Sequence, residues 1–301
     1  MADHRLTVCP DEGSFHRLWH QRGVSLLSPG ELAFVGGGLA DRPAWVFIAG
    51  YQAALRQCFP VFAAIARAGA SASESPSNSV SNSAGWGSYL VSEQRDATKR
   101  PTCLVTESAA GLLLNGTKSW LASAAHLQWL IVKVQHGEHA HQLLVPVDRA
   151  GVQILGRRSG EFLPEMSVAG ARFRDTSVNT IEDLATSQQY ADKFVFIESR
   201  CLMIALCGHF TAVAQRGNLD TARLIQARLI IEGLVTAELD QIESLRGLLA
   251  GMNALRDWFD DWLTTETGTQ ADAQQAQLRT RWAANQRLVD MHRGFLERRL
   301  A

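Results

Sequence analysis

The sequence predicts an α+β fold in which helices at both ends of the chain flank a central group of strands. Apolar residues recur at helical spacing through most of residues 1–67 and again from about 188 to 299. The part between them contains segments typical of paired strands. At 301 residues the chain is long enough to bury a sizeable core. We therefore expect three parts, at residues 1–87, 88–182 and 183–301.

The first part is predicted to be helical. Asp41-Arg42-Pro43 opens a helix that runs from about Ala44 to Cys58, because proline suits the first helical turn. Apolar residues lie on nearly every face of this helix, so we expect it to be buried or at a subunit contact. Residues 68–88 are rich in Ser, Ala, Gly and Asn. They bury too little apolar surface to become ordered, which predicts a flexible loop.

Two hairpins are predicted in the central part. Asn115-Gly116 accepts the positive φ angles of a type I′ turn, which predicts a tight hairpin at that dipeptide. A second pair of strands, LQWLIVKVQ and HQLLVPVD, is joined by the polar turn His136-Gly137-Glu138-His139. Beyond these strands, residues such as Ile197, Cys201 and Ile204 form a helical stripe.

Composition and short motifs exclude several kinds of protein. The formal net charge of −1, from 29 basic and 30 acidic residues, gives no electrostatic case for binding nucleic acid or an anionic membrane. The five cysteines lack CxxC spacing, which indicates reduced thiols. The N-terminus is unlike a signal peptide, and the longest apolar tract is interrupted by polar residues. Gly36-Gly37-Gly38 lacks the spacing and preceding strand of a dinucleotide loop. We expect a soluble cytoplasmic protein.

The histidines do not predict a metal site. His16 and His20 have a zinc-compatible helical spacing, but the segment lacks the Glu of HExxH. His136, His139 and His141 cluster at a turn that we expect to be solvated. No metal ligand is therefore predicted.

The stretch from Gly111 to Asp148 resembles a known family. Its LNGTKSW segment, followed by small residues, an apolar strand and LVPVD-x-x-GV, resembles the middle β-domain of the acyl-CoA dehydrogenases. The likeness covers roughly residues 85–180 and is weaker to about 250. These flavoenzymes oxidise the Cα–Cβ bond of acyl-CoA thioesters in fatty acid metabolism. The resemblance implies an acyl-CoA-dehydrogenase-like fold with N-terminal helices, a central β-domain and a C-terminal helical bundle. It also implies an FAD cofactor and an acyl-CoA or other acyl thioester as substrate.

Two residues correspond to the family's Thr-Glu-Pro segment and the Gly-Ser-Asp segment after it, which line the flavin and reach its phosphates. Ser92 keeps a hydroxyl at the place of the threonine, and Thr98 stands in for the later serine. Arg95 and Asp96 replace the glycines of the family motif, which removes the backbone freedom that allows a close approach to phosphate. The resemblance therefore implies that Ser92 and Thr98 bind FAD.

A second family motif, Trp-Ile-Thr, packs on the flavin ring and hydrogen-bonds its N5. Trp120 matches the tryptophan, whereas the threonine position is Ala122, with Ser123 beside it. The resemblance implies that Trp120 and Ser123 contact the flavin. A buried strand aromatic is the open alternative for Trp120.

The catalytic base is implied less directly. In most family members a Glu near the C-terminus takes the α-proton, in a Tyr-Glu-Gly-Thr segment that this chain does not contain. Some members carry the Glu on the first C-terminal helix, just before an Arg. Glu198, two residues before Arg200, lies one residue out of phase with that position. It is the candidate base, and a solvated or Arg-paired surface acid is the alternative.

Two functions therefore stay open, together with two kinds of assembly. The chain is either an FAD-dependent dehydrogenase with a relocated base or a catalytically silent relative that acts as a structural or partner subunit without bound FAD. Its generous apolar stripes predict a homodimer or homotetramer through the C-terminal helices, or a mixed complex with a related subunit. An unrelated binding module with a chance LNGTKSW hairpin is disfavoured by the co-linear LVPVD segment.

Overall fold

The computed structural model describes residues 7–72, 85–92, 103–109, 111–159, 163–178 and 193–216, with isolated helical positions from 229 to 298. The chain divides into two compact units. Unit 1 comprises Met1–Cys9, Leu27–Ala53 and Val195–Ala301, and unit 2 comprises Pro10–Leu26 and Ala54–Phe194. Neither unit is a continuous stretch of chain.

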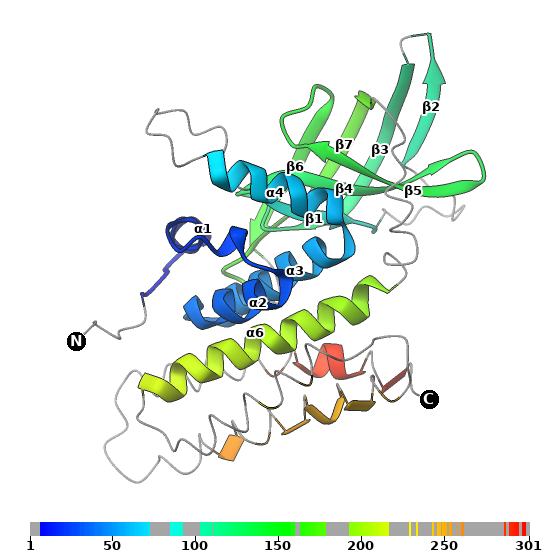
Figure 1. Cartoon of the computed structure of the whole chain (residues 1–301). Helices are drawn as coiled ribbons and strands as arrows, with labels where there is room; N and C mark the ends of the chain where they lie inside the picture. The colour runs from blue at the N-terminus through cyan, green and yellow to red at the C-terminus, as the bar shows by residue number, and fades with distance from the viewer. Residues whose placement is uncertain are drawn as a thin grey trace. The chain divides into compact units, whose positions relative to one another are not determined.

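Helices come first, then strands, then helices again (Figure 1). The N-terminal helices are α1 (Glu12–Gln21), η1 (Val24–Leu26), α2 (Pro29–Leu39), α3 (Pro43–Cys58) and α4 (Pro60–Ala72). The strands are β1 (Trp86–Leu90), β2 (Leu104–Ser108), β3 (Gly111–Ala122), β4 (Leu127–His136), β5 (His139–Pro146), β6 (Val152–Ser159) and β7 (Ser167–Val178). They are followed by α6 (Phe194–Arg216), and the described positions beyond it are also helical. This order agrees with the predicted α+β class.

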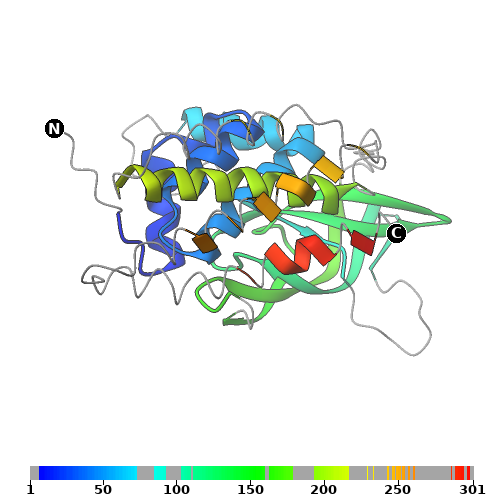
Figure 2. The same cartoon turned by 90° about the horizontal axis from the view of Figure 1, so that it is seen from below.

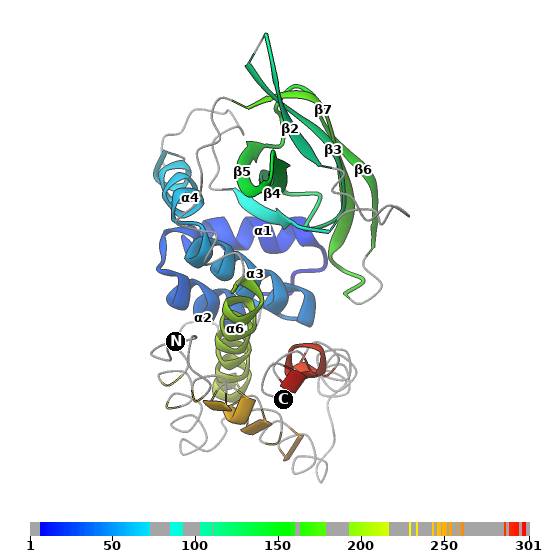
Figure 3. The ribbon, with the colours of Figure 1, turned by 90° about the vertical axis from the view of Figure 1, so that its right-hand side faces the viewer.

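The described strands of unit 2 form one seven-stranded sheet, which is strongly curved (Figure 3). Its order is β1-β4-β2-β3-β7-β6, and β5 pairs with β4 outside this path. β1 and β4 are parallel, whereas the β2–β3, β3–β7, β4–β5 and β6–β7 pairs are antiparallel. The predicted hairpin between β4 and β5 is confirmed, because His136 pairs with His139 across Gly137, which has a φ of 58°.

Helices α1 and α4 of unit 2 contact the strands through buried side chains. Glu12, buried on α1, accepts a 2.7 Å hydrogen bond from the backbone N–H of Ser167 on β7. The ring of Phe62 on α4 lies against Gly87, where a β-carbon would come within 2.7 Å of its Cζ. β1 thus begins at Trp86, inside the segment predicted as a loop, because Trp86 is wholly buried. α4 extends to residue 72, and residues 73–84 of the predicted loop lie outside the described part of the chain.

The predicted hairpin at Asn115-Gly116 is wrong. β3 runs through both residues, and the chain reverses earlier, where Ser108 of β2 pairs with Gly111. Gly116 has a φ of 137° at a register shift against β7, which marks a β-bulge. Asn115 donates to Asp175 Oδ1 at 3.1 Å and accepts from its backbone N–H at 2.8 Å. The positive φ that predicted a turn is therefore used in a bulge within a long strand.

We expect Gly116→Val to destabilise unit 2. A β-branched side chain disfavours a φ of 137°, and such backbone strain costs about 1–3 kcal/mol. The free energy of unfolding in urea measures the effect. Thr106→Val is the matched control, because Thr106 is an exposed strand residue without a positive φ. Equal stability of the two variants would contradict the assignment of strain to Gly116.

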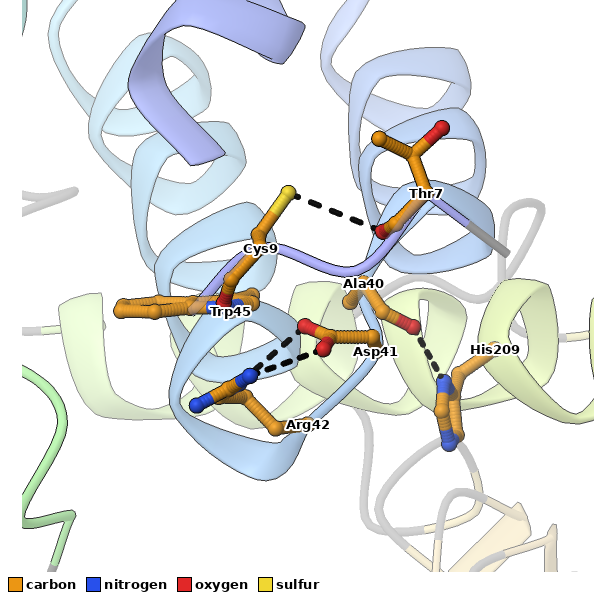
Figure 4. Close-up of polar contacts among 7 residues, drawn as sticks. All are labelled: Thr7, Cys9, Ala40, Asp41, Arg42, Trp45 and His209. Carbon is orange, nitrogen blue, oxygen red and sulfur yellow. Dashed lines mark hydrogen bonds and ion pairs between the residues drawn. The ribbon is translucent and has the colours of Figure 1, made fainter. Parts of the chain in front are cut away.

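In unit 1 a buried ion pair precedes α3 (Figure 4). Asp41 is almost completely buried and binds the Arg42 guanidinium in a bidentate manner, at 2.9 and 3.1 Å. The guanidinium lies 5.6 Å from the ring centroid of Trp45, whose indole N–H donates to the Cys9 carbonyl at 3.1 Å. These contacts join the start of α3 to the N-terminal segment. The predicted helix from Ala44 to Cys58 is confirmed, and its side chains are buried along nearly its whole length.

Glycines bring α6 against α2 and α3 in unit 1, and Figure 2 shows α6 running alongside them. A β-carbon at Gly37 of α2 would collide with the Ala205 carbonyl, and one at Gly208 of α6 would collide with the Phe34 carbonyl. A β-carbon at Gly50 of α3 would lie 2.6 Å from Leu202 Cα. The backbones therefore touch directly. The three-glycine segment of α2 is a helix-packing surface.

The window Phe194–Val213 of α6 is long and apolar enough to cross a membrane, but 83% of it is buried inside the protein. The central helix of a globular protein has the same properties. Midway along α6, His209 Nδ1 donates to the Ala40 carbonyl at 2.9 Å (Figure 4), so a buried polar group is paired there. The apolar composition of α6 is therefore explained by its burial in this structure.

We expect Gly208→Ala to destabilise unit 1, because the added methyl group must push α6 away from α2. Overpacking of this kind costs about 1–3 kcal/mol. Gly247→Ala is the matched control, since Gly247 is an exposed helical position where a β-carbon meets nothing, and alanine favours the helix. Thermal unfolding followed by circular dichroism compares the two. A melting temperature for Gly208→Ala at or above that of Gly247→Ala would exclude the tight backbone contact.

Candidate functional site

Two of the predicted flavin residues lie next to each other in unit 2. Ser92 follows β1, and Trp120 lies near the end of β3. The Ser119 backbone N–H donates to the Ser92 carbonyl at 2.9 Å, which fixes the two segments side by side. Ser92 is exposed and Trp120 is half-buried. The structure therefore places the backbone segments that carry Ser92 and Trp120 side by side, and neither side chain is fully buried.

Two buried polar residues hold the same segments together. Ser88 Oγ accepts a 3.1 Å hydrogen bond from the Ala122 backbone N–H, and Lys118 Nζ donates to the Val91 carbonyl at 3.4 Å. Both side chains are buried. No sequence signal identifies either residue, because a serine or a lysine in a strand is usually on the solvent face.

Ser123 is less accessible than the resemblance implies. It follows β3 with a φ of 57° and is fully buried, and its Oγ has no hydrogen-bond partner among the described residues. Ala122, at the family's threonine position, is also fully buried. Neither side chain is open to a ligand in this conformation. Thr98, Arg95 and Asp96 lie outside the described residues.

Glu198 lies on α6 in unit 1 and is half-buried, so it is not a fully solvated surface acid. Burial raises the pKa of its carboxyl from 4.5 to about 8. A carboxylate whose pKa lies near neutral pH binds a proton more readily than an ordinary Glu. This is the property that a general base needs.

Beside Glu198 in sequence, Ser199 forms a buried hydrogen bond with His292. Ser199 Oγ lies 2.7 Å from His292 Nδ1 and donates its proton to the Val195 carbonyl at 2.8 Å. Because a hydroxyl has one proton, His292 Nδ1 must donate, which leaves Nε2 unprotonated. Nε2 is buried and has no partner among the described residues. Burial lowers the pKa of His292 to about 4.

Histidine pairs occur elsewhere, without a complete metal site. His16 and His20 face each other on α1 with their Nε2 atoms 3.0 Å apart, and burial is the main cause that lowers the pKa of each. His136, His139 and His141 lie at the β4–β5 turn, where His139 is exposed. Among the described residues no group of three or more His, Cys, Asp or Glu is arranged to hold a metal ion.

Solved structures with the same arrangement define the class of fold. Apo-form PigA aligns with a TM-score of 0.62 at 14% sequence identity, covering 98% of this chain and 94% of PigA. Butyryl-CoA dehydrogenase from Megasphaera elsdenii aligns with a TM-score of 0.54 at 10% identity, covering 94% of this chain and 89% of that one. A chain of the ChsE4-ChsE5 complex from Mycobacterium tuberculosis aligns with a TM-score of 0.53 at 14% identity, covering 99% and 89%.

The chain therefore has an acyl-CoA-dehydrogenase-like fold, as its sequence predicts. PigA has also been solved as an FAD complex and with FAD and proline, so FAD-binding proteins are among those that share the fold. No family model matches the sequence. No curated protein is significantly similar to it in sequence either.

The buried His292 predicts that acid destabilises the protein. Its folded pKa of about 4 lies below the ordinary 6.5, so between these values the unfolded chain binds a proton that the folded chain does not. The stabilisation is complete above pH 6.5 and is lost as the pH falls toward 4, by an amount on the order of 1–3 kcal/mol. Urea unfolding at pH 7 and pH 5 measures it.

His292→Gln should reduce this pH dependence without removing it, because burial also lowers the pKa of His16 and His20. The exposed His139→Gln, as control, should keep it. If wild type and His292→Gln lost equal stability on acidification, the pH dependence would have to come from other groups.

Proposed function

We propose that the protein is a flavoprotein that oxidises the Cα–Cβ bond of an acyl thioester with FAD. The observation that carries the proposal is the adjacency of an exposed Ser92 and a half-buried Trp120, at positions matching the family motifs, in an acyl-CoA-dehydrogenase-like fold. Ser92 is exposed and adds nothing to a hydrophobic core, and Trp120 leaves part of its indole accessible although most of the ring is buried. Their retention therefore favours a binding role.

The residues at this place fit a flavin. The indole of Trp120 offers a flat apolar surface, and the Ser92 hydroxyl offers a donor and an acceptor beside it. The hydrogen bond between the Ser119 N–H and the Ser92 carbonyl joins the backbone segments that carry the two groups. When bound, FAD supplies the acceptor for the hydride equivalent that leaves Cβ of the substrate. Ser123 and Thr98 stay candidate contacts that the resemblance implies.

Glu198 is the candidate base. In this proposal its carboxylate takes the proton from Cα of the thioester and holds it as a neutral carboxylic acid. The raised pKa, near 8, makes that uptake favourable at neutral pH. Activity should therefore increase with pH up to about 8, because the residue acts in its deprotonated form.

The second candidate is a catalytically silent relative that acts as a structural or partner subunit. The buried Ala122 and Ser123 favour it, because neither presents a hydroxyl where the family places one against the flavin. One of the structures with this fold is the complex of two different chains, ChsE4 and ChsE5. We propose that the chain assembles as a homodimer, a homotetramer or a mixed complex with a related subunit. We also propose a cytoplasmic location.

The test is to add FAD to the purified full-length protein and to measure bound flavin by its absorbance. Turnover is then assayed with a panel of acyl-CoAs of different chain length. A prolyl thioester belongs in the panel, because PigA was solved with FAD and proline. We expect Trp120→Ala to weaken FAD binding and Glu198→Gln to lower kcat by about 10²–10⁴-fold with FAD still bound.

Glu243→Gln is the matched control, because Glu243 is an exposed helical residue whose side chain is 78% accessible. It should keep full activity. Bound flavin with equal turnover in wild type and Glu198→Gln would eliminate Glu198 as the base. Absence of FAD uptake at any concentration would favour the silent relative.

A further inference from the structure

Two histidines one turn apart on α1 face each other at the surface of unit 2. The Nε2 atoms of His16 and His20 are 3.0 Å apart, and both residues are half-buried, so each keeps part of its surface in contact with solvent. Neither residue belongs to the proposed flavin or base positions. Their arrangement therefore needs its own explanation.

The two rings do not lie end to end along the line that joins their Nε2 atoms, although these atoms are within hydrogen-bond distance. The ring centroids are only 4.3 Å apart and the planes are inclined by 72°. If both ring axes lay on the line joining the nitrogens, the centroids would be separated by both ring radii in addition to the 3.0 Å. At least one Nε2 axis therefore points off that line.

Neighbouring rings hold His16 in this orientation. Trp86 meets it edge to face at a centroid distance of 4.6 Å, and His126 stacks on it at 5.0 Å with an interplanar angle of 20°. Gly13 makes room for His126, since a β-carbon there would lie 3.3 Å from two of its ring atoms. His16 is thus fixed by its surroundings, as expected of a ligand that is positioned in advance.

We propose that His16 and His20 chelate a divalent first-row transition metal through their Nε2 atoms. A metal at about 2.05 Å from both nitrogens, a usual distance to imidazole, would make an N–metal–N angle of about 94° at the observed separation. That angle suits neighbouring positions of a tetragonal site, the geometry that Cu²⁺ and Ni²⁺ prefer. A small increase in the nitrogen separation would suit tetrahedral Zn²⁺.

Within the part of the chain that the structure describes, the remaining coordination positions have no protein ligand. No third His, Cys, Asp or Glu completes the site within the described residues, so water or an added ligand occupies them. Arg17 interacts electrostatically with His16, and Arg56 with His20. Their positive charges oppose a dication, which makes a site of modest affinity. An anionic outside ligand should therefore strengthen metal binding.

The experiment titrates the full-length, metal-free protein at pH 7.5 with CuCl₂, NiCl₂, ZnCl₂ and MgCl₂. Isothermal titration calorimetry gives the affinity, and quenching of tryptophan fluorescence by Cu²⁺ reports on the contact between His16 and Trp86. We expect one equivalent of Cu²⁺ to bind more tightly than Ni²⁺ or Zn²⁺, with no binding of Mg²⁺. His16→Gln and His20→Gln should each weaken Cu²⁺ binding by about tenfold or more.

His139→Gln controls for the histidines of the β4–β5 turn and should leave the affinity unchanged. Equal Cu²⁺ affinity in wild type and His20→Gln, or loss of binding in His139→Gln, would overturn the proposal. If either α1 variant fails to fold, diethyl pyrocarbonate labelling of the wild-type protein tests whether the metal binds at His16 and His20. Bound Zn²⁺ must then protect His16 and His20 but not His139. Unprotected α1 histidines would reject the site whether or not the protein binds flavin.

Discussion

The direct contact between backbones on α6 is the constraint on which unit 1 depends. Gly208 of α6 lies against the Phe34 carbonyl of α2, and Gly37 of α2 lies against the Ala205 carbonyl of α6. Each of the two helices therefore supplies one glycine and one carbonyl to the contact. At this distance Cα–H groups face carbonyl oxygens, and each such contact contributes about 0.5–1 kcal/mol. Gly50 provides the same closeness to α3. These contacts use no side chain, which explains why Gly37, Gly50 and Gly208 stand in helices that would otherwise favour alanine.

In unit 2 the corresponding constraint is polar. Two hydrogen bonds, from Ser119 to Ser92 and from Ala122 to Ser88, tie β3 to β1, although these strands are not neighbours in the sheet order. The bond from Ser119 ends at the exposed Ser92, and the bond from Ala122 ends at the buried Ser88. The pair therefore fixes the strand ends without apolar packing at the exposed end. Trp120, in the same part of β3, leaves part of its ring accessible.

Local sequence patterns predicted the parts of the fold that local interactions determine. The β4–β5 hairpin follows from alternating residues around a glycine turn, and α3 follows from Pro43 and its apolar residues. The hairpin predicted at Asn115-Gly116 is wrong because the preference for positive φ is a local property. The choice between a turn and a bulge depends on contacts with distant residues. Asp175, sixty residues later, pairs with Asn115 and stabilises the continuous strand. No short-range pattern contains that information.

The same distinction between local sequence patterns and long-range contacts applies to the candidate site. Motif likeness selected Ser92 and Trp120 as candidates, and the structure adds that their backbone segments lie side by side, with Ser92 exposed and Trp120 half-buried. It also buries Ser123, and a buried serine cannot be distinguished in sequence from an exposed one. Glu198 lies close to an alternative base position by spacing. Its raised pKa arises from burial on α6, a property of helix packing that residue spacing does not reveal.

The replacement of threonine by Ala122 has a structural meaning beyond the loss of a hydroxyl. Ala122 is fully buried, and its N–H is already used by Ser88, so this position now serves the junction of β1 and β3. A site that has drifted to a purely structural role would also be expected to cover or replace its indole. Trp120 instead keeps part of its surface open beside an exposed hydroxyl. Stability accounts for position 122 but not for that exposure, and this difference places the binding proposal ahead of the silent one.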